Sequence, residues 1–391
     1  MMDFELSDEQ RDIRDTVRAF VTKEILPLEE DFLRLVREGG ARLPRDEERR
    51  LRAKARAFGF WGLSTPEEYG GMALPAVTQS LINVELAKTC VPFRFGGEAD
   101  NILYGADAAQ QEEYLKPTIE GERLGCFALT EPGAGSDAGA ISTYARRDGD
   151  DWLINGEKTF ISNGDDADYA IVIALTDRDK GARHGATAFL VDREAGWTSS
   201  RISTMGSWHQ PASLSFDDVR VPAGKVLGEV GGGFELAMRW VGKGRYVISA
   251  QCVGIAERCL KMAVDYAGLR ETFGRKIGQN QAIQWMIADS ETELEAARWL
   301  ALRAAWDVDR GADARHASAM AKLFCTGMVG RVVDRALQIH GGMGYTKELP
   351  LEGWYRAVRA MRIFEGTDEV QRLILSRDLL RGHTRIGGHL A

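Results

Sequence analysis

The sequence predicts an α+β protein built from an N-terminal helical domain (1–124), a central β-domain (125–232) and a C-terminal helical bundle (233–391). Apolar residues recur at helical spacing before about residue 125 and again after 233. Between these regions, turn signals separate short runs rich in aromatic and β-branched residues. We expect these runs to form a small β-barrel or sandwich. A chain of 391 residues also exceeds the usual size of one domain.

The first helix of the N-terminal domain has a clear start signal. Ser7-x-x-Gln10 is a capping box, in which each side chain accepts from a backbone N–H of the other residue. Apolar residues then continue at helical spacing until Pro27. Further helices are expected in stretches that end near Gly39-Gly40 and Gly59, and at about 75–89 and 110–119.

The central domain is predicted from its short apolar runs and from turn dipeptides such as Asp148-Gly149 and Asn163-Gly164. Strands are expected at 125–130, 151–155, 169–175, 186–191, 197–202 and 213–219.

Long helices with short connections predict a bundle in the last third of the chain. They are expected at about 234–269, 281–309 and 314–339, with shorter ones after Pro350 and Thr367. A glycine cluster at 228–233 resembles a dinucleotide-binding loop, but no alternating βαβ pattern surrounds it. We interpret it as the hinge between the β-domain and the bundle.

Composition excludes several classes of function. The net charge is −8 and no basic block exists, so a nucleic-acid partner is not expected. No apolar run reaches membrane-spanning length and the start is not a signal peptide, so we expect a cytoplasmic protein without a membrane partner. The five cysteines have no CxxC spacing and are expected to be reduced core thiols. The six histidines lack metal-ligand spacing, so no metal is expected.

One segment near the C-terminus suits acid–base chemistry. Glu365 follows two large apolar residues and precedes Gly366, and Thr367 can N-cap the helix that begins there. Partial desolvation would raise the proton affinity of its carboxylate, as a general base requires. Position alone favours a solvated glutamate, since most glutamates near helix starts are solvated. An apolar run is expected to give this helix one buried face: Val370, Leu373, Ile374 and Leu380.

A second segment has the composition of a ligand-binding loop. Residues 127–137 read Phe-Ala-Leu-Thr-Glu-Pro-Gly-Ala-Gly-Ser-Asp, a short strand followed by a forced turn. Backbone N–H groups in such a turn can face a ligand, and Thr130 and Ser136 add hydroxyl donors. A glycine-rich connection without function is the alternative.

Taken together, these segments resemble the acyl-CoA dehydrogenase family of flavoenzymes over essentially the whole chain. Several further motifs in the family's order carry the resemblance: Leu6-Ser7-Asp8-Glu9-Gln10, Lys158-Thr159-Phe160-Ile161-Ser162-Asn163-Gly164, Phe216-Asp217-Asp218-Val219-Arg220-Val221-Pro222, Arg270-Glu271-Thr272-Phe273-Gly274 and Gln338-Ile339-His340-Gly341-Gly342-Met343-Gly344-Tyr345.

The resemblance implies an acyl-CoA dehydrogenase fold, FAD bound between the β-domain and the bundle, and an acyl-CoA substrate of fatty acid metabolism. Glu365 is then the base that removes the α-proton, while the β-hydrogen passes as hydride to flavin N5. Gly366 lets the thioester approach closely, Ser136 contacts CoA, and Arg245 matches a basic residue near CoA. An arginine in a helix is otherwise a solvated charge.

The resemblance also implies the cofactor site. Thr130 would hydrogen-bond the flavin ring, Ser162 would keep a hydroxyl near N5, and Phe160 would stack where many relatives have tryptophan. One group is implied to reach the FAD of a neighbouring subunit in a homotetramer, a dimer of dimers: Arg270, Phe273, Gln281, Gln338, Gly341 and Gly342. The remaining expected cofactor contacts are Phe127, Leu129, Gly135, Ser136, Thr367 and Glu369.

Two departures from the family pattern stand out. Some relatives carry the base next to Arg245, where this chain has Gly244, so the base is expected to be Glu365. The segment Trp208 to Leu214 lacks the glutamate that most members have near Ser213, and His209 within it is interpreted as a structural residue.

The electron acceptor and the acyl group stay open at this stage. Electron-transfer flavoprotein is the expected acceptor. An oxidase that uses oxygen, or a non-catalytic scaffold on the same fold, remains an alternative.

Overall fold

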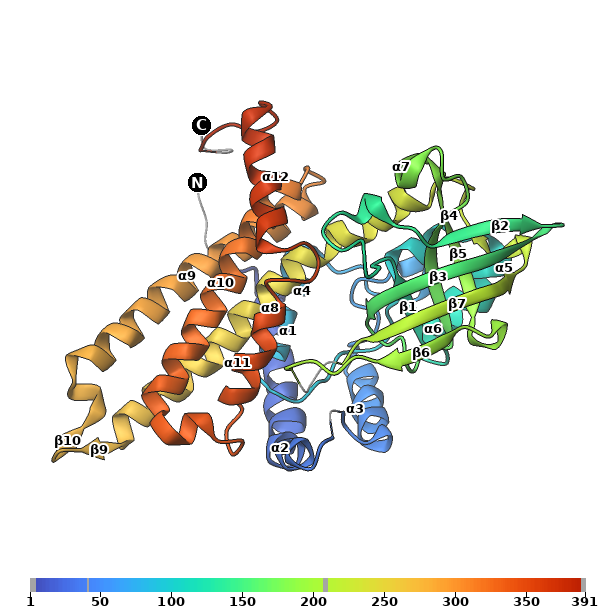
Figure 1. The fold of residues 1–391 in the computed structure, drawn as a ribbon. Helices are drawn as coiled ribbons and strands as arrows, with labels where there is room; N and C mark the ends of the chain where they lie inside the picture. The colour runs from blue at the N-terminus through green and yellow to red at the C-terminus, as the bar shows by residue number, and fades with distance from the viewer. Residues whose placement is uncertain (1–4, 41, 207–209, 388–391) are drawn as a thin grey trace.

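The computed structural model describes residues 5–40, 42–206 and 210–387, with the backbone alone at 241–243. The chain forms two helical regions with a β-sheet region beside them (Figure 1). No helix in these ranges is both long enough and apolar enough to cross a membrane.

The N-terminal region is helical, as predicted. The capping box is present, with Ser7 Oγ accepting from the N–H of Gln10 and Gln10 Oε1 accepting from that of Ser7, both at 3.1 Å. The helices are α1 (Asp8–Phe20), α2 (Glu29–Arg37), α3 (Arg45–Ala57), α4 (Ala76–Leu86), α5 (Ala108–Gln110) and α6 (Lys116–Glu120), with π-helical turns at Val21–Ile25 and Gln111–Leu115.

The β-domain is one open mixed sheet. Its strands are β1 (Gly125–Ala128), β2 (Tyr144–Asp148), β3 (Asp151–Ile161), β4 (Tyr169–Leu175), β5 (Ala186–Asp192), β6 (Thr198–Arg201), β7 (Ala212–Val221) and β8 (Val226–Leu227), with the short helix α7 (Gly181–Gly185) between β4 and β5. The order is β6-β7-β3-β2-β4-β5-β8, and β1 pairs in parallel with β4. The two end strands do not pair in the described residues, so the sheet does not close into the barrel that was one of the two expected forms.

Strand β4 lies at the centre of this domain and is buried on both faces. Its odd-numbered residues, such as Ile171, pack into one core and its even-numbered residues, such as Val172, into another. The sequence missed β2, whose arginines obscure the apolar pattern, and β8, which has only two residues.

The bundle contains the expected long helices: α8 (Gly233–Leu269), α9 (Gln281–Asp309) and α10 (Arg315–His340). The shorter α11 (Leu351–Ala360) and α12 (Asp368–Leu380) follow. A small hairpin of β9 (Glu271–Thr272) and β10 (Arg275–Lys276), not predicted from the sequence, caps the end farthest from the β-domain (Figure 1). We propose the domain division at 124/125 and 232/233, because β1 and α8 begin there.

The N-terminal region is divided between two cores. Residues such as Phe20 and Ile82 share a core with α8, α9 and α10, whereas Leu103 and Tyr114 pack against the β-sheet. Gly254 on α8 allows close packing, because a side chain there would overlap the backbone of Val84 on α4.

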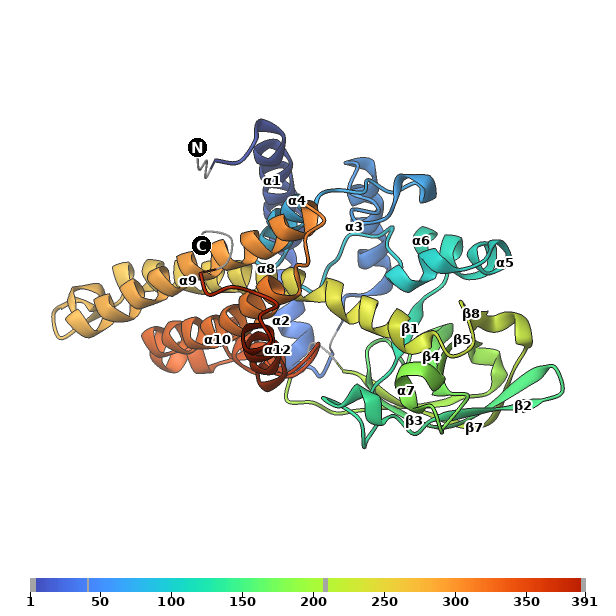
Figure 2. The same cartoon turned by 90° about the horizontal axis from the view of Figure 1, so that it is seen from above.

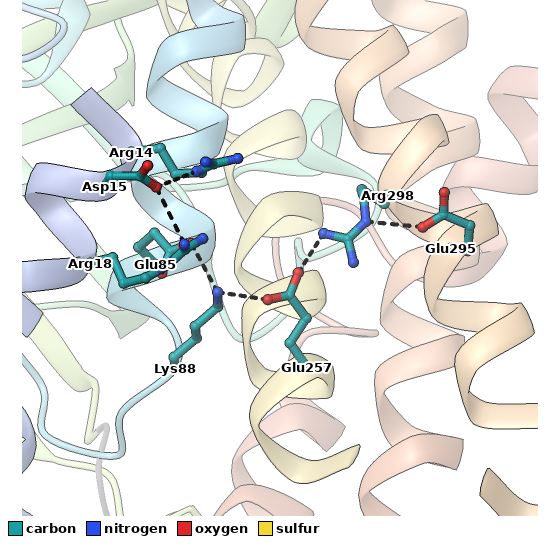
Figure 3. A network of polar contacts seen from close by, with 8 residues as sticks. All are labelled: Arg14, Asp15, Arg18, Glu85, Lys88, Glu257, Glu295 and Arg298. Atoms are coloured by element: carbon teal, nitrogen blue, oxygen red, sulfur yellow. Dashed lines mark hydrogen bonds and ion pairs between the residues drawn. The ribbon is translucent and has the colours of Figure 1, made fainter. Parts of the chain in front are cut away.

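A chain of ion pairs also joins the N-terminal helices to the bundle (Figure 3). Lys88 lies at its centre and donates to Glu85 at 2.8 Å and to Glu257 at 2.7 Å. The Glu85 side chain is 2% exposed, so its charge depends on these partners. The other members are Arg14, Asp15, Arg18, Glu295 and Arg298.

The predicted state of the cysteines is confirmed. Cys90, Cys126, Cys252, Cys259 and Cys325 are all free and buried.

Candidate active site

Glu365 lies on the short connection between α11 and α12. Thr367 caps α12 as predicted, its side chain accepting from the N–H of Val370 at 3.2 Å. Glu365 itself has a φ of +53°, in the left-handed region that residues other than glycine rarely adopt. Such a conformation costs about 1–3 kcal/mol and persists only where surrounding contacts hold it. Contacts with the surrounding residues must therefore hold the backbone of Glu365 in this conformation.

The Glu365 carboxylate lies against helix α8 at Gly244. A Cβ atom at position 244 would overlap Oε2 of Glu365. This oxygen is buried and has no hydrogen-bond partner among the described residues. Gly244 thus makes the space that the carboxylate occupies, and an unbonded carboxylate oxygen is available to a substrate.

The surroundings of Glu365 favour its protonated form. Burial raises the pKa of Glu365, and the positive charges of Arg245, Lys322 and Arg94 only partly oppose this. The direction agrees with the prediction, but the expected cause was incomplete. Ile363 and Phe364 are 56% and 41% exposed, so helices α8 and α10 must supply much of the burial.

Two polar side chains that were not predicted from the sequence hold the Glu365–Gly366 backbone. The ammonium of Lys322 on α10 donates to the carbonyl of Gly366 at 2.8 Å. The amide of Gln371 on α12 donates to the same carbonyl at 2.8 Å and to that of Glu365 at 3.2 Å. Lys322 and Gln371 are both fully buried. The sequence signal was a charged residue at a core position of an otherwise small and apolar helix face.

The buried face of α12 differs from the predicted one. The predicted apolar face is wrong, since Leu373 is 45% and Leu380 86% exposed. The buried residues of this helix are Asp368, Gln371 and Asp378. Polar groups face inward here because they bond to the loop and to neighbouring charged side chains rather than to an apolar core.

The β-domain contributes a second constrained loop. The carbonyl of Thr130 accepts from the N–H of Thr159 at 2.8 Å, which joins the loop after β1 to strand β3. Next to it, the buried ammonium of Lys158 donates to the carbonyl of Leu129 at 3.0 Å and to Glu131 at 2.8 Å. Lys158 and Glu131 were not predicted as site residues.

The Lys158–Glu131 pair is a buried ion pair with strongly shifted pKa values. Burial lowers the pKa of Lys158 to about 8, although Glu131 favours its charged form. Burial acts to raise the pKa of Glu131, but Lys158 and donors from Ser142 and Thr143 outweigh it and bring the pKa to about 2. Both groups are charged at neutral pH and fix the loop around Thr130.

Phe160 follows this pair and projects from the sheet. Its φ is +56° and its side chain is 61% exposed. A strained, exposed aromatic residue beside a hydroxyl-bearing loop suits a planar ring ligand. Ser162, two residues later, is also exposed.

Helix α8 contacts both the Glu365 side chain and strand β1, which leads into the Thr130 loop. Trp240 on α8 stacks on Phe127 of β1, with ring centroids 4.3 Å apart. Gly244 comes one turn later on the same face, about 6 Å along the helix axis. Because Gly244 contacts the Glu365 carboxylate, Glu365 and the start of the Thr130 loop lie against the same stretch of α8, where the bundle meets the β-domain (Figure 2).

Two of the predicted CoA contacts have contrasting surroundings. Ser136 and Gly135 are exposed, and the space around Gly135 is open. Arg245 is only 8% exposed, and its Nε is buried without a partner among the described residues. Arg245 is therefore a buried cation beside Glu365, rather than the solvated charge that a helical arginine is by default.

A separate group of predicted residues lies far from Glu365. Helices α8 and α10 meet at the end of the bundle that carries the β9–β10 hairpin, where Tyr266 and His340 stack at 4.5 Å. Phe273, at the hairpin tip, has a φ of +52° and is fully exposed. The group comprises Arg270, Phe273, Gln281, Gln338, Gly341 and Gly342, all of them exposed. One subunit does not bring this group to the Glu365 loop (Figure 1).

The residue set fits a flavin on chemical grounds. The β-domain side offers an exposed aromatic ring at Phe160, the hydroxyl of Thr130 and open space beside Gly133 and Gly135. The hairpin end offers Arg270, which makes no ion pair among the described residues and could meet a phosphate.

Of the two residues singled out in the segment that departs from the family pattern, His209 lies outside the described residues. Ser213 makes a polar contact with Thr159 at 3.2 Å.

Comparisons with known proteins cover the whole described fold. The family models described as acyl-CoA dehydrogenase N-terminal, middle and C-terminal domains match residues 7–122, 126–219 and 231–380. The (R)-benzylsuccinyl-CoA dehydrogenase of Thauera aromatica is 36% identical over 398 aligned positions, covering 97% of each chain. The 3-(aryl)acrylate reductase of Clostridium sporogenes is 38% identical, covering 94% of this chain and 98% of its own. A glutaryl-CoA complex of glutaryl-coenzyme A dehydrogenase superposes with a TM-score of 0.87 at 33% identity, covering 97% of both chains.

Proposed function

The chain belongs to the acyl-CoA dehydrogenase family of FAD-dependent oxidoreductases, and we propose that it oxidises an acyl-CoA thioester to the 2-enoyl-CoA with Glu365 as the base. The carboxylate accepts the α-proton, and the β-hydrogen leaves with its electron pair. Bound FAD supplies the hydride acceptor at N5. The observation that carries this proposal is the buried Oε2 of Glu365, which has no hydrogen-bond partner in the described part of the chain.

The raised pKa of Glu365 supports its role as a base. A base with a higher proton affinity is better matched to the weakly acidic α C–H. The space at Gly244 keeps the carboxylate next to the junction of the bundle and the β-domain, where the substrate would enter between them.

The backbone of the same loop offers charge stabilisation. The carbonyls of Glu365 and Gly366 accept from Gln371 and Lys322, which fixes the two peptide groups on the C-terminal side of Glu365, Glu365–Gly366 and Gly366–Thr367. The N–H groups of Glu365 and Gly366 make no hydrogen bond within the described ranges. We propose that the Glu365 N–H donates to the thioester oxygen, where negative charge develops as the α-proton leaves. Gly366 permits the approach because it carries no side chain.

Two groups of residues are proposed to hold FAD. The β-domain and the start of α12 would supply the ring contacts: Thr130, Phe160 and Ser162, together with Phe127, Leu129, Gly135, Ser136, Thr367 and Glu369. The hairpin group supplies contacts to the FAD of a neighbouring subunit, because it lies at the opposite end of the bundle (Figure 1). This arrangement requires an oligomer, which we propose to be a homotetramer. Ser136 and Arg245 are proposed to contact CoA.

The shared cofactor site is testable at Arg270. Arg270→Ala should lower FAD affinity and loosen the oligomer together, because a charge-assisted contact to phosphate contributes about 1.5–3 kcal/mol. FAD retention and sedimentation velocity measure the two effects. Unchanged values for both would count against a shared site.

The function itself is tested by anaerobic bleaching of the bound flavin. The thioester panel should include butyryl-CoA, glutaryl-CoA and benzylsuccinyl-CoA, since relatives act on acyl groups of different size and charge. Bleaching by any of them supports a dehydrogenase. Rapid recolouring in air would favour an oxidase, and slow recolouring that electron-transfer flavoprotein accelerates would favour that protein as acceptor. A reconstituted protein that no thioester bleaches would contradict the proposal.

A further inference from the structure

Lys322 is a charged side chain in the core of the bundle, and its only contact with the Glu365 loop among the described hydrogen bonds is through the backbone. It lies on α10, its side chain is fully buried, and the neighbouring core residues on that helix are small, such as Ala319, Ala321 and Cys325. A buried ammonium costs several kcal/mol unless its charge and its donors are engaged. Its surroundings therefore need an explanation.

The ammonium of Lys322 makes one hydrogen bond among the described residues, to the carbonyl of Gly366 at 2.8 Å. The amide of Gln371 donates to the same carbonyl, also at 2.8 Å. Both of its partners are carbonyl oxygens, so the Gln371 amide must present its nitrogen. A Cβ on Gly366 would lie 2.6 Å from this nitrogen, and the φ of +89° there also favours glycine. The two donors thus fix the Gly366–Thr367 peptide, and the second bond of Gln371, to the Glu365 carbonyl, fixes the Glu365–Gly366 peptide.

We propose that Lys322 is a positioning residue for the dehydrogenation, clamping the Gly366 carbonyl so that Glu365 stays left-handed with its carboxylate against Gly244. This inference rests on the proposed role of Glu365 as the base. Lys322 touches neither substrate nor cofactor in this arrangement. It acts through the backbone of the base and through its own charge.

The charge of Lys322 also affects the pKa of Glu365. Three cations oppose the effect of burial on the pKa of Glu365: Arg245 on α8, Lys322 on α10 and Arg94 on the loop after α4. Lys322 in turn faces Asp368, Cys252, Glu365 and Arg245, and burial lowers its pKa. Removing the ammonium would therefore raise the pKa of Glu365 further and move proton abstraction to higher pH.

A purely structural role would predict something different. Asp368 already bonds to Arg362 at 2.7 Å, and it also lies 3.5 Å from the Thr326 hydroxyl. If Lys322 only stabilised the bundle, its loss would lower the melting temperature without a specific effect on the base. The pH dependence of flavin reduction separates the two cases.

The experiment compares three variants of the FAD-loaded enzyme. Lys322→Met removes both the clamp and the charge, Gln371→Leu removes clamp donors without changing charge, and Thr326→Val alters the same wall of α10 without touching the Gly366 carbonyl. For each protein we would measure the rate of flavin bleaching by a saturating thioester across pH, and hydrogen exchange of residues 363–371 by mass spectrometry.

We expect Lys322→Met to lose about 10²-fold in bleaching rate, as for a reacting group displaced by about 1 Å, with its pH midpoint raised. Gln371→Leu should lose rate while its midpoint stays in place, and both should exchange faster at 363–371. Thr326→Val should match the wild type in both readouts. Should Lys322→Met fail to fold, Lys322→Gln retains a donor without the charge and should raise the midpoint with a smaller loss of rate.

Wild-type rate, midpoint and exchange in Lys322→Met would overturn the inference, as would an equal midpoint shift in Thr326→Val. Failure of the wild-type protein to bleach with any thioester would instead sink the proposed function. In that case the hydrogen-exchange comparison still decides whether Lys322 clamps the loop.

Discussion

The two loops that meet at the junction of the bundle and the β-domain are built on the same device. In each, a fully buried lysine donates to a backbone carbonyl next to the residue proposed to act: Lys158 to Leu129, beside Thr130, and Lys322 to Gly366, beside Glu365. The difference lies in the partner. Lys158 also binds the carboxylate of Glu131 at 2.8 Å, whereas no carboxylate lies within hydrogen-bond reach of Lys322 in the described chain.

This difference separates a rigid support of the backbone from a charge that adjusts the pKa of Glu365, the proposed base. At the β-domain loop the two charges neutralise each other, so the pair can fix a backbone without a net field. At the bundle loop no anion of the described chain is bonded to the ammonium, and its positive charge acts through space on Asp368 and on Glu365. Lys158 therefore only anchors its loop, whereas Lys322 both anchors its loop and lowers the pKa of Glu365.

The largest effect should come from the base itself. Glu365→Gln keeps the shape of the side chain but cannot accept a proton, so turnover should fall about 10²–10⁴-fold. The variant should stay yellow and still show a flavin spectral shift on binding thioester, without bleaching. Near-normal bleaching would mean that another group is the base, and Gly244 leaves no candidate beside Arg245.

Breaking the neutral pair should damage the fold rather than tune the base. Lys158→Met leaves the Glu131 carboxylate buried without its cation, which costs about 3–5 kcal/mol of unfolding free energy. Urea unfolding and FAD retention measure this loss. Any protein that still binds FAD should keep the wild-type pH midpoint of bleaching, in contrast to Lys322→Met.

Lys158→Met should also change how the unfolding free energy depends on pH in acid. A carboxylate with a lowered pKa stabilises the fold above its unfolded pKa, and this stability is lost as the pH falls toward the folded value. For Glu131 the window runs from about 4.5 down to about 2. The unfolding free energy of the wild type should therefore fall through this range, and that of Lys158→Met should fall less steeply. An equally steep decline in both proteins would argue against the ion pair.

Much of this architecture follows from sequence, because helix caps, apolar periodicity and turn dipeptides are local signals. The capping box at Ser7, the N-cap at Thr367 and the long helices of the bundle are confirmed on those grounds. The buried residues of α12 were mispredicted, because Gln371 bonds to a loop whose position no periodicity reveals.

The anchoring lysines were missed for a related reason. A lysine at a core position looks like an error in the pattern until the carbonyl that it meets is known. For Lys322 that carbonyl is 44 residues away in the sequence, and for Lys158 it is 29 residues away. The site residues taken from the resemblance remain proposals for the experiments above.

A substitution at Gly244 tests the position of the Glu365 carboxylate from the side of α8. Gly244→Ala would place a methyl group where Oε2 of Glu365 lies, and because that methyl group is fixed to the helix, the Glu365 side chain would have to move away. We expect about a 10²-fold loss of bleaching rate from a displaced base. A crystal structure of the variant should show the Glu365 carboxylate moved away from α8. Wild-type kinetics would mean that the carboxylate works from a different position.

The smallest effect should come from Arg94, which separates exposed from buried charge at the same base. Arg94 is exposed between the buried Phe93 and Phe95, and it makes no ion pair in the described part of the chain. Its charge also lowers the pKa of Glu365, but solvent and salt screen it. Arg94→Gln should slow bleaching about twofold below the pH midpoint, in line with about 0.2–1 kcal/mol for exposed charges. That effect should vanish in about 1 M salt, where the Debye length is about 3 Å, whereas the effect of Lys322→Met should persist because its charge is buried. A salt-sensitive Lys322 effect, or a salt-insensitive Arg94 effect, would show that the field at Glu365 has a different origin.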